Sequence, residues 1–397
     1  MVGALLTASL GSCNPFTSEF RLLQTGRLVV WHPFEGREGD AFEKILSKYM
    51  QLYPDRRIVV ERFTEEELIV NFQKQARSGL GPTLVIANEN PTLSQLIEHN
   101  LIKSLSAGEV NARIFSPDTL GEVRLGDSYY GIPFSSVTQV LCYNRQRVAK
   151  APETLTELSD EVRAGKKLGI VSDFVSTLWG VGAFGNGIFN DRGQILLAQS
   201  GWAAWLDWLK GARAHPNVIL NSDIAKLQDS FADEQLDYYV CKSWEIPILR
   251  DQLGRKNLGI SLLPGNEDRH ATPVTNTRAI AYNRAVAERE FKLGLELGQY
   301  LTNVEQQIQF AIATESQIPS NKNAKIDPRL SPLEAILLEQ VKFSKPIPLE
   351  FIFTSDNNIQ QALDTGNLYY NRVLEGEISP QQAAEELSEQ LRALLKR

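Results

Sequence analysis

The chain has 397 residues, 43% of them hydrophobic, so it can bury a large core and is too long for one typical domain. Its formal net charge is −7 and it contains no block of Lys and Arg, which excludes the clustered basic face that nucleic-acid binding requires. Its 4 histidines and 3 cysteines show neither His-x3-His nor CxxC spacing, so neither a zinc site nor any other cofactor is predicted.

The N-terminus resembles the signal of a bacterial lipoprotein. Leu10 to Cys13 closes a short apolar run with the small residues of a lipoprotein cleavage box, which makes residues 1–13 a signal and Cys13 the predicted lipidation site. No Lys or Arg precedes the run, which leaves open a start upstream of Met1. The alternative is a tail in which the cysteine has no role. Residues 14–26 are predicted to be a tether, and no later stretch has the roughly 18 apolar residues that a spanning helix needs.

The first part of the folded region alternates strands and helices. Short apolar runs predict buried strands, and apolar residues that recur on one helical face predict the helices between them. Asp40 and Glu43 form a capping-box pattern, which predicts that the first helix starts at Asp40. Strands are predicted at residues 28–31, 58–60 and 83–87, and helices from residue 40, around 68–76 and around 93–97.

A long extended segment, residues 129–143, has no room for a helix between its halves and predicts a strand that crosses from one lobe to another. A second set of strands and helices follows, and the chain is mostly helical from Ala285 onward. Trp202, Trp205 and Trp208 recur at helical spacing and are interpreted as core. Further strands are predicted at residues 168–171, 238–241, 258–263 and 277–282, and the last helix starts at Ser379.

Two cysteines remain beyond the signal. Cys142 and Cys241 either pair in an oxidising compartment or remain two buried free thiols, and the sequence leaves both alternatives open.

Several short sequence motifs occur in a fixed order along the chain. They are RLVVW at residues 27–31, GPTLVIA at 81–87, YGIP at 130–133, NLGISLLP at 257–264 and GEISPQQAA at 376–384. In this order they resemble the extracellular (periplasmic) solute-binding proteins of the maltose-binding, sugar-type family, the capture components of ABC importers. Leu155 and Cys142 differ from the residues that are usual in that family at these positions. The ligand of this chain is therefore harder to infer from the family.

The resemblance implies a two-lobe α/β fold, the type II periplasmic-binding-protein fold. Each lobe is expected to be a mixed, mostly parallel sheet flanked by helices, and the lobes are expected to close on a ligand about a hinge. The crossings are expected near residues 134–138, 265–276 and 319–324. One lobe would then hold residues 27–134 plus 277–320, and the other residues 135–276 plus 325–397.

A sugar presents hydroxyl groups and apolar faces, so its site needs aromatic rings together with carboxylate or amide side chains. Such residues follow the predicted strands at the edge where open α/β sheets bind ligands. From this position and from the resemblance, ligand contacts are expected from Trp31, His32, Phe34, Glu35, Asn88, Glu89, Asn90, Ser135, Gln139, Asp173, Phe174, Trp244, Glu245, Asn276 and Phe353.

Several of these expectations have a structural alternative. Trp31 can pack under its loop as core while Glu35 is a solvated charge. Residues 88–90 can serve only to turn the chain and cap the next helix. Ser135 and Gln139 can satisfy hydrogen bonds at a strand edge.

The leading interpretation is a monomeric, lipid-anchored protein of the periplasm or cell surface, which binds a sugar or oligosaccharide and delivers it to the permease subunits of an ABC transporter. The same fold could instead bind a polyamine or other charged solute, or serve as the ligand-sensing partner of a membrane receptor. A glycosidase is disfavoured because Glu35 and Glu38 share one loop instead of flanking a cleft. No GxSxG, Walker A or HExxH motif is present, so no catalytic residue is expected.

Overall fold

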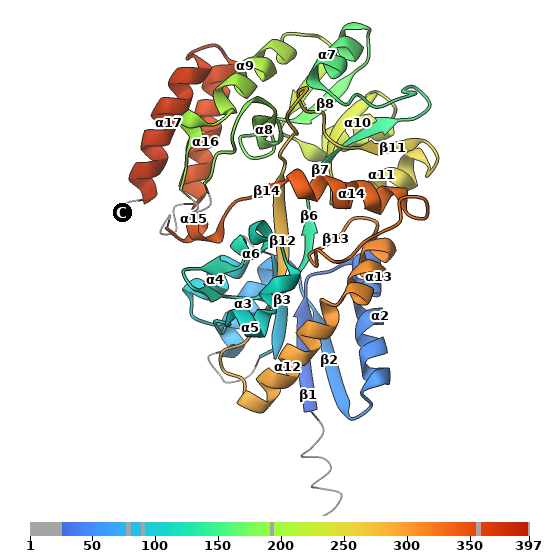
Figure 1. Ribbon diagram of the computed structural model, residues 1–397, viewed down its shortest axis with the longest axis vertical. Helices are drawn as coiled ribbons and strands as arrows, with labels where there is room; N and C mark the ends of the chain where they lie inside the picture. The colour runs from blue at the N-terminus through green and yellow to red at the C-terminus, as the bar shows by residue number, and fades with distance from the viewer. Residues whose placement is uncertain (1–25, 77–80, 89–91, 191–193, 355–358, 396–397) are drawn as a thin grey trace, which may run out of the picture.

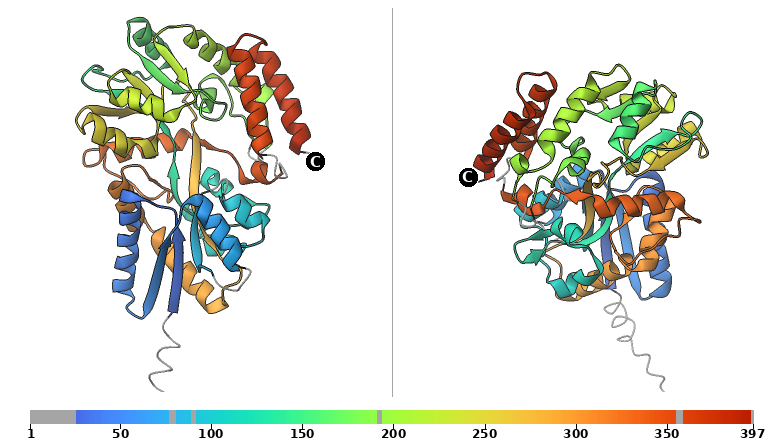
Figure 2. Two further views of the ribbon diagram at one scale, coloured as in Figure 1. Left: turned by 180° about the vertical axis from the view of Figure 1, so that it is seen from behind. Right: turned by 45° about the horizontal axis from the view of Figure 1, so that its top comes forward.

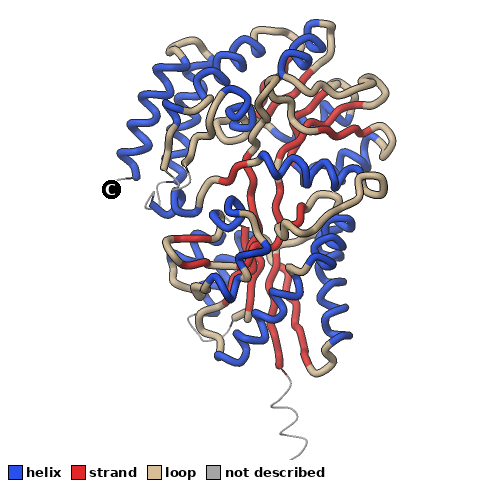
Figure 3. The backbone as a smooth tube through the Cα atoms, viewed as in Figure 1, coloured by secondary structure: helices blue, strands red, loops and turns tan. Residues whose placement is uncertain are grey.

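A computed structural model describes residues 26–76, 81–88, 92–190, 194–354 and 359–395 of the chain. Two lobes lie one above the other along the long axis, and extended strands connect them (Figure 1). Strands occupy the middle of each lobe and helices surround them (Figure 3). The predicted two-lobe α/β fold is therefore confirmed.

The sheet of the first lobe is buried on both faces, which explains its continuous apolar strands. Leu28 and Val30 face the core around α2, whereas Val29 and Trp31 face the core around α3. In the described part of the chain the strand order is β13-β6-β12-β3-β1-β2, with β14 paired to β12. The strands are β1 (Gly26–His32), β2 (Arg56–Arg62), β3 (Leu84–Asn88), β6 (Ile132–Val137), β12 (Val274–Tyr282), β13 (Ile318–Pro319) and β14 (Lys345–Pro346).

The helices of the first lobe cover both faces of this sheet. One core lies under α2, α12 and α13, and a second lies under α3 and α4. A short hairpin of β4 and β5 follows α6. The elements are α2 (Gly36–Leu52), α3 (Glu65–Ala76), α4 (Ser94–Glu98), α5 (Ala107–Val110), α6 (Pro117–Gly121), β4 (Arg124–Leu125), β5 (Ser128–Tyr129), α12 (Glu288–Leu301) and α13 (Val304–Thr314).

The predicted start of the first helix at Asp40 is wrong, because α2 begins one turn earlier, at Gly36. The chain turns at Gly36, where φ is +46°, a conformation that glycine adopts without strain. The carbonyl of Glu35 then accepts hydrogen bonds from the backbone N–H groups of Glu38 and Gly39, each at 3.1 Å. Backbone groups thus begin the helix, and Asp40 is an exposed residue within it.

The second lobe holds the other sheet, with strand order β11-β7-β10-β8-β9 in the described chain. Trp202 and Trp205 are fully buried in its core, as predicted, and Trp208 stacks on Trp205. The strands are β7 (Gln139–Asn144), β8 (Leu168–Val171), β9 (Val218–Asn221), β10 (Tyr238–Lys242) and β11 (Leu258–Ser261). The helices are α7 (Leu155–Arg163), α8 (Val181–Phe184), α9 (Trp202–Arg213), α10 (Ile224–Ala232), α11 (Ile246–Leu253), α14 (Pro332–Phe343), α15 (Leu349–Thr354), α16 (Ile359–Leu374) and α17 (Pro380–Leu395).

A disulfide joins Cys142 in β7 to Cys241 in β10. These strands are antiparallel neighbours, with Cys142 opposite Tyr239 and Cys241 opposite Val140. The two cysteines are therefore diagonal neighbours on one face of the sheet, and both are fully buried. The alternative of two free thiols is wrong.

The chain passes between the lobes at Thr138, which separates β6 in the first sheet from β7 in the second. The start of β12 pairs with β14 close to the same crossing. Among the helices that the structure describes, none is both long and apolar enough to span a membrane.

Candidate functional site

The carboxyl ends of β1, β2 and β3 point toward the second lobe, and those of β8 and β10 point toward the first. In the first sheet, β1 is parallel to β2 and β3, and all three run opposite to β12, which descends from the crossing. In the second sheet, β7 leads away from the crossing, while β8 and β10 run back toward it. Figure 2 (left) shows the blue N-terminal strands reaching up toward the second lobe. The loops that follow these strands therefore lie between the lobes, where α/β sheets bind ligands.

Arg278 is the centre of a polar network at the strand ends of the first lobe. Its Nε donates to Oδ1 of Asn88 at 2.9 Å, and its Nη1 donates to Oε2 of Glu38 at 2.9 Å. The guanidinium carbon lies 4.9 Å from the centre of the Phe34 ring, within the range of a cation–π contact. Because the Arg278 and Glu38 side chains are only 20% and 19% exposed, this charge pair is well fixed.

The network continues from Glu38 to the segment before β13. Oε1 of Glu38 accepts from Nε2 of Gln317 at 2.7 Å and from Oγ of Ser316 at 2.9 Å. Oε1 of Gln317 in turn accepts from Oγ of Ser135 at 2.7 Å. Residues distant in sequence thus form one hydrogen-bonded surface, which includes the predicted Asn88 and Ser135.

Two further charged residues of this region, Arg278 and Glu65, were not predicted from the sequence. Arg278 lies inside an apolar strand, and its charge in that run was the available signal. Glu65, at the start of α3, accepts a hydrogen bond from Oγ1 of Thr92. Burial raises the pKa of Glu65, and the charge of Arg278 opposes that rise. Both side chains belong to the edge of the sheet at which a ligand is expected.

Three residues predicted for this site lie in the core. The Phe34 side chain is 1% exposed and packs against the rings of Phe42 and Phe310. The Trp31 side chain is 1% exposed and packs against Phe63 and Phe72, with ring centres 4.6 and 6.0 Å away. His32 is fully buried beside Phe42. Contact between any of these residues and a ligand stays a prediction, and it requires the side chain to leave this packing.

The environment of His32 keeps its imidazole neutral. The backbone N–H of Phe34 donates to Nδ1 of His32 at 3.2 Å. Burial lowers the pKa of His32 from 6.5 to about 4, although the carboxylate of Glu43 opposes this shift. Between these two values the unfolded chain binds a proton that the folded protein does not.

Folding stability is therefore expected to fall as the pH is lowered from about 6.5 to about 4, because protonation then favours the unfolded chain. With a pKa of about 4 in the folded state, the contribution of His32 to the free energy of unfolding decreases by about 3 kcal/mol over this range. Urea unfolding at several pH values measures it, with His32→Asn as the comparison, since asparagine can accept the hydrogen bond but does not titrate. Equal pH dependence in both proteins would contradict the expectation.

In the second lobe, Trp244 follows β10 and is the exposed member of its loop. Its side chain is 39% exposed, and the ammonium group of Lys242 lies 4.9 Å from the ring centre. The next residue, Glu245, is 2% exposed and accepts hydrogen bonds from the hydroxyl of Tyr239 at 2.7 Å and the backbone N–H of Lys242 at 2.6 Å. Burial raises the pKa of Glu245. Trp244 therefore presents its ring to solvent, whereas Glu245 holds the loop in place.

A second cluster forms at the end of β8. Oδ1 of Asp173 accepts from the backbone N–H of Ser176 at 2.7 Å, and Nε2 of Gln139 donates to the carbonyl of Ser176 at 2.9 Å. Phe174 is 6% exposed and packs against Trp202. The structure thus brings Asp173 and Gln139 together, while the ring of Phe174 belongs to the core.

The other predicted residues are dispersed. Glu35 is exposed at the start of α2, and Asn276 is exposed on β12. Cys13, Glu89, Asn90 and the side chain of Phe353 lie outside the described part of the protein. Within the described residues, no three His, Cys, Asp or Glu side chains are grouped so that they could hold a metal ion.

An ionic cluster connects the two lobes beside this region. Glu315, at the end of α13, lies 3.0 Å from Arg37 of α2 and 3.0 Å from Arg250 of α11. It also lies 2.7 Å from Arg255, and Arg37 lies 3.6 Å from Asp251. One carboxylate of the first lobe thus joins guanidinium groups of both lobes.

Comparison with known proteins gives a consistent result. Residues 44–333 match the family described as "Bacterial extracellular solute-binding protein". A maltotriose-binding protein of Pyrococcus abyssi (strain GE5 / Orsay) is 26% identical over 179 residues, which are 42% of this chain and only 38% of that protein. A galactooligosaccharide-binding protein of Bacillus subtilis (strain 168) is 22% identical over 425 positions, covering 99% of this chain and 96% of that protein. The solved structure of a cyclo/maltodextrin-binding protein complexed with maltotetraose has a TM-score of 0.77 at 18% identity, covers 93% of this chain and 97% of the other, and shows the same fold.

Proposed function

Because the chain belongs to the family of bacterial extracellular solute-binding proteins, we propose that it captures a sugar or oligosaccharide between its two lobes and delivers it to the permease of an ABC importer. The names of the relatives that bind maltotriose and galactooligosaccharides support this class of ligand. The observation that carries the proposal is the pair of surfaces at opposing strand ends. One is the polar network around Arg278, and the other carries the exposed ring of Trp244.

These two surfaces fit the two kinds of surface on a sugar. Carboxylate and amide groups such as those of Glu38 and Asn88 bind hydroxyl groups, and an indole ring such as that of Trp244 stacks on the apolar face of a pyranose. A ligand bound to both lobes favours the closed arrangement by the difference between its affinities for the closed and open states. Binding is thereby coupled to a change of shape that a permease can recognise.

The charge at this site favours a neutral ligand over a polyamine. Arg278 forms an ion pair with Glu38, so that carboxylate is already neutralised within the protein. A polyamine would have to displace Arg278 or find other carboxylates, whereas a sugar hydroxyl can use the remaining acceptor capacity of the network. We therefore rank a sugar before a cationic solute.

The proposal extends to the other predicted contacts and to the setting of the protein. We propose that residues of the surrounding segments complete the site. They are Glu35, Glu89, Asn90, Asp173, Asn276 and Phe353. The lobes are proposed to divide close to the residue ranges predicted from the sequence, with the first boundary at Thr138, a few residues later than the predicted boundary. A lipid on Cys13 is proposed to hold a monomer at the outer side of the cytoplasmic membrane, with no catalytic activity.

The test is a thermal-shift screen of the chain from residue 14 onward against malto-oligosaccharides, galacto-oligosaccharides and polyamines. A ligand at 100 times its dissociation constant adds about 2.7 kcal/mol to the stability of the folded state, which raises the melting temperature measurably. A sugar that stabilises the protein and is recovered unchanged supports the proposal. Stabilisation by a polyamine alone would contradict the sugar assignment and leave the family membership intact.

Replacing Trp244 by alanine is expected to weaken sugar binding about thirtyfold, since a buried aromatic contact of this kind contributes about 2 kcal/mol. Isothermal titration calorimetry with the sugar found in the screen measures this effect. Tyr53→Ala is a matched control, because Tyr53 is also an aromatic residue, 40% exposed, but lies at the far end of α2. If the Trp244 variant and the wild type bound the sugar with equal affinity, Trp244 would not be part of the site.

A further inference from the structure

The first lobe has a basic end, which faces away from the second lobe. Because the carboxyl ends of β1 and β2 point toward the second lobe, the first residues of these strands lie at the opposite end (Figure 1). The last residues of β12 lie there as well, since β12 is antiparallel to its neighbour β3. We call this surface the basic pole, and it consists of residues 26–27, 52–57 and 283–289.

The basic pole is positively charged, although the protein as a whole is negative. It contains five arginines and two acidic residues, a formal charge of +3, whereas the whole chain has a charge of −7. The charged residues of the pole are Arg27, Asp55, Arg56, Arg57, Arg284, Glu288 and Arg289. Ion pairs balance Arg56, which lies 2.6 Å from Glu296, and Glu288, which lies 3.7 Å from both Lys103 and Lys292. The charge that remains for a partner is therefore mainly that of exposed arginines.

Two of these arginines are neighbours whose charges repel each other. Arg27 and Arg57 are register partners on the parallel strands β1 and β2, and both are exposed. Like charges side by side on neighbouring strands destabilise a sheet. No acidic side chain in the described part of the chain forms an ion pair with either arginine. A repulsive pair at this position is therefore better explained by an anionic partner than by the needs of folding.

Exposed apolar side chains lie beside the arginines. Leu52 and Tyr53, at the end of α2, are 58% and 40% exposed. The guanidinium carbon of Arg56 lies 4.6 Å from the centre of the Tyr53 ring, and Arg56 is the register partner of Gly26 at the start of β1. A tyrosine next to basic residues suits the surface of a bilayer, where its ring meets apolar groups and its hydroxyl meets polar ones.

The predicted lipid anchor leads to this same surface. The strand β1 begins at Gly26, and 12 residues, 14–25, separate it from Cys13. A chain of this length spans at most about 45 Å, even when it is fully extended. A lipid on Cys13 thus keeps the basic pole close to the membrane. A weak contact between the pole and the membrane then becomes effective, because the tether raises its local concentration.

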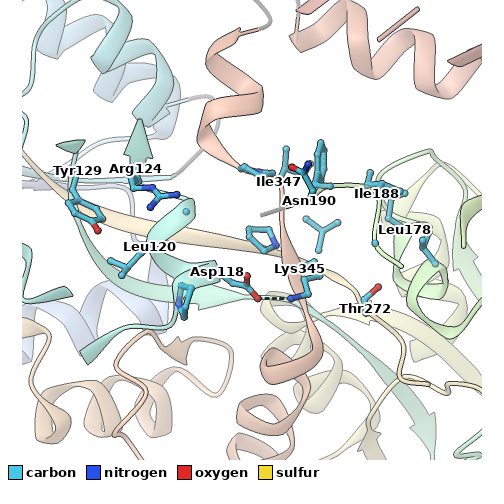
Figure 4. A pocket seen from close by; sticks show the side chains of 18 residues that line it. Asp118, Leu120, Arg124, Tyr129, Leu178, Ile188, Asn190, Thr272, Lys345 and Ile347 are labelled. Atoms are coloured by element: carbon cyan, nitrogen blue, oxygen red, sulfur yellow. Dashed lines mark hydrogen bonds and ion pairs between the residues drawn. The ribbon is translucent and has the colours of Figure 1, made fainter. Parts of the chain in front are cut away.

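We infer that the basic pole rests on the anionic phospholipid headgroups of the membrane to which the chain is anchored. Arg27 and Arg57 bind headgroup phosphates, and Leu52 and Tyr53 lie among the headgroups. The contact rests on the proposed lipid anchor but not on the identity of the ligand. It keeps the cleft between the lobes, with its cavity of about 410 Å³ (Figure 4), turned away from the membrane. The protein then captures its ligand on the outer side and has to leave the headgroups before both lobes can reach a permease.

Hydrogen exchange of the tethered protein tests this contact. The chain from Cys13 onward is coupled through the Cys13 thiol to a maleimide lipid, since the disulfide between Cys142 and Cys241 leaves one free thiol. The vesicles contain either phosphatidylcholine alone or equal parts of phosphatidylcholine and phosphatidylglycerol. We expect the backbone amides of residues 52–57 and 283–289 to exchange at least about fivefold more slowly on the anionic vesicles, which is the effect of one arginine at such a surface. Equal exchange on both kinds of vesicle would overturn the inference.

Paired variants separate the contact from a general effect of charge. Arg27→Gln/Arg57→Gln should abolish the slower exchange and keep the melting temperature of the wild type, because it also removes a repulsion between neighbouring strands. Arg145→Gln/Arg163→Gln removes the same charge from exposed positions of the second lobe and should leave the slower exchange unchanged. Slower exchange that survives in the first variant, or that is lost in both, would overturn the inference.

The membrane contact and the proposed ligand can fail separately. If the tethered protein shows the slower exchange and no sugar stabilises the chain in the thermal-shift screen, the sugar assignment fails and the membrane contact stands. If a sugar stabilises the chain and exchange is equal on both kinds of vesicle, the membrane contact fails and the proposed function stands.

Discussion

Removing the disulfide between Cys142 and Cys241 is expected to lower the free energy of unfolding by about 4 to 5 kcal/mol. The two cysteines are 99 residues apart, and a crosslink that closes so long a loop restricts the unfolded chain strongly. Urea unfolding of Cys142→Ala/Cys241→Ala without reducing agent measures the change. We expect the largest loss of stability from this substitution, since it acts on the whole unfolded chain.

Two comparisons separate the crosslink from the packing of the sulfur atoms. Both cysteines are fully buried, so alanine also leaves a small void. Reduced wild-type protein keeps the sulfur atoms and lacks only the bond. Reducing agent should therefore destabilise the wild type and leave the double variant unchanged. If reducing agent left the free energy of unfolding of the wild type unchanged, the disulfide would not be stabilising.

Arg278→Leu is expected to weaken sugar binding about 100-fold and to lower the free energy of unfolding by about 2 kcal/mol. Leucine keeps an apolar side chain over Phe34 but leaves Oε2 of Glu38 and Oδ1 of Asn88 without the guanidinium that donates to them. Truncating one member of a buried charge pair typically costs about 3 to 5 kcal/mol, and partial exposure of this pair reduces that value. Calorimetry with the sugar and urea unfolding measure the two effects.

A double-mutant cycle identifies the origin of this effect. Glu38→Gln removes the partner charge, so Arg278→Leu should destabilise a Glu38→Gln background less than the wild type. Arg284→Ala is a matched control, because Arg284 is an exposed arginine just beyond the end of β12 and should have little effect. Wild-type affinity in Arg278→Leu would contradict the proposed role of the network.

Most of the fold could be predicted from the sequence because its signals are local. Strands buried on both faces appear as continuous apolar runs, such as residues 28–31 and 168–171. The start of α2 was missed because a glycine and a backbone carbonyl begin it, so no capping side chain marks the position. The short strands β13 and β14 depend on their partners in the sheet, which local sequence does not reveal.

The candidate site could be predicted only in part, for a different reason. Strand-end position directed attention to Asn88 and hinge position to Ser135, and both residues join the network. Position in the sequence does not reveal toward which face of the sheet each side chain points. Trp31 shares its face of β1 with Val29 and therefore packs on α3. Arg278 was missed because its importance lies in contacts with residues far away in sequence, and only the folded chain brings these together.

Because the ionic cluster at Glu315 joins the two lobes, the arrangement of the lobes is expected to depend on the salt concentration around the protein. Dissolved ions weaken attraction between charges, with a screening length of about 8 Å at physiological ionic strength and about 3 Å in 1 M salt. Added salt is therefore expected to weaken the exposed pair of Arg37 and Asp251 most, and the largely buried pair of Glu315 and Arg250 least. For a member of an extracellular family, salinity is set by the habitat rather than by the cell. The fraction of molecules whose lobes are held in the described arrangement is therefore expected to fall as the salt concentration around the protein rises.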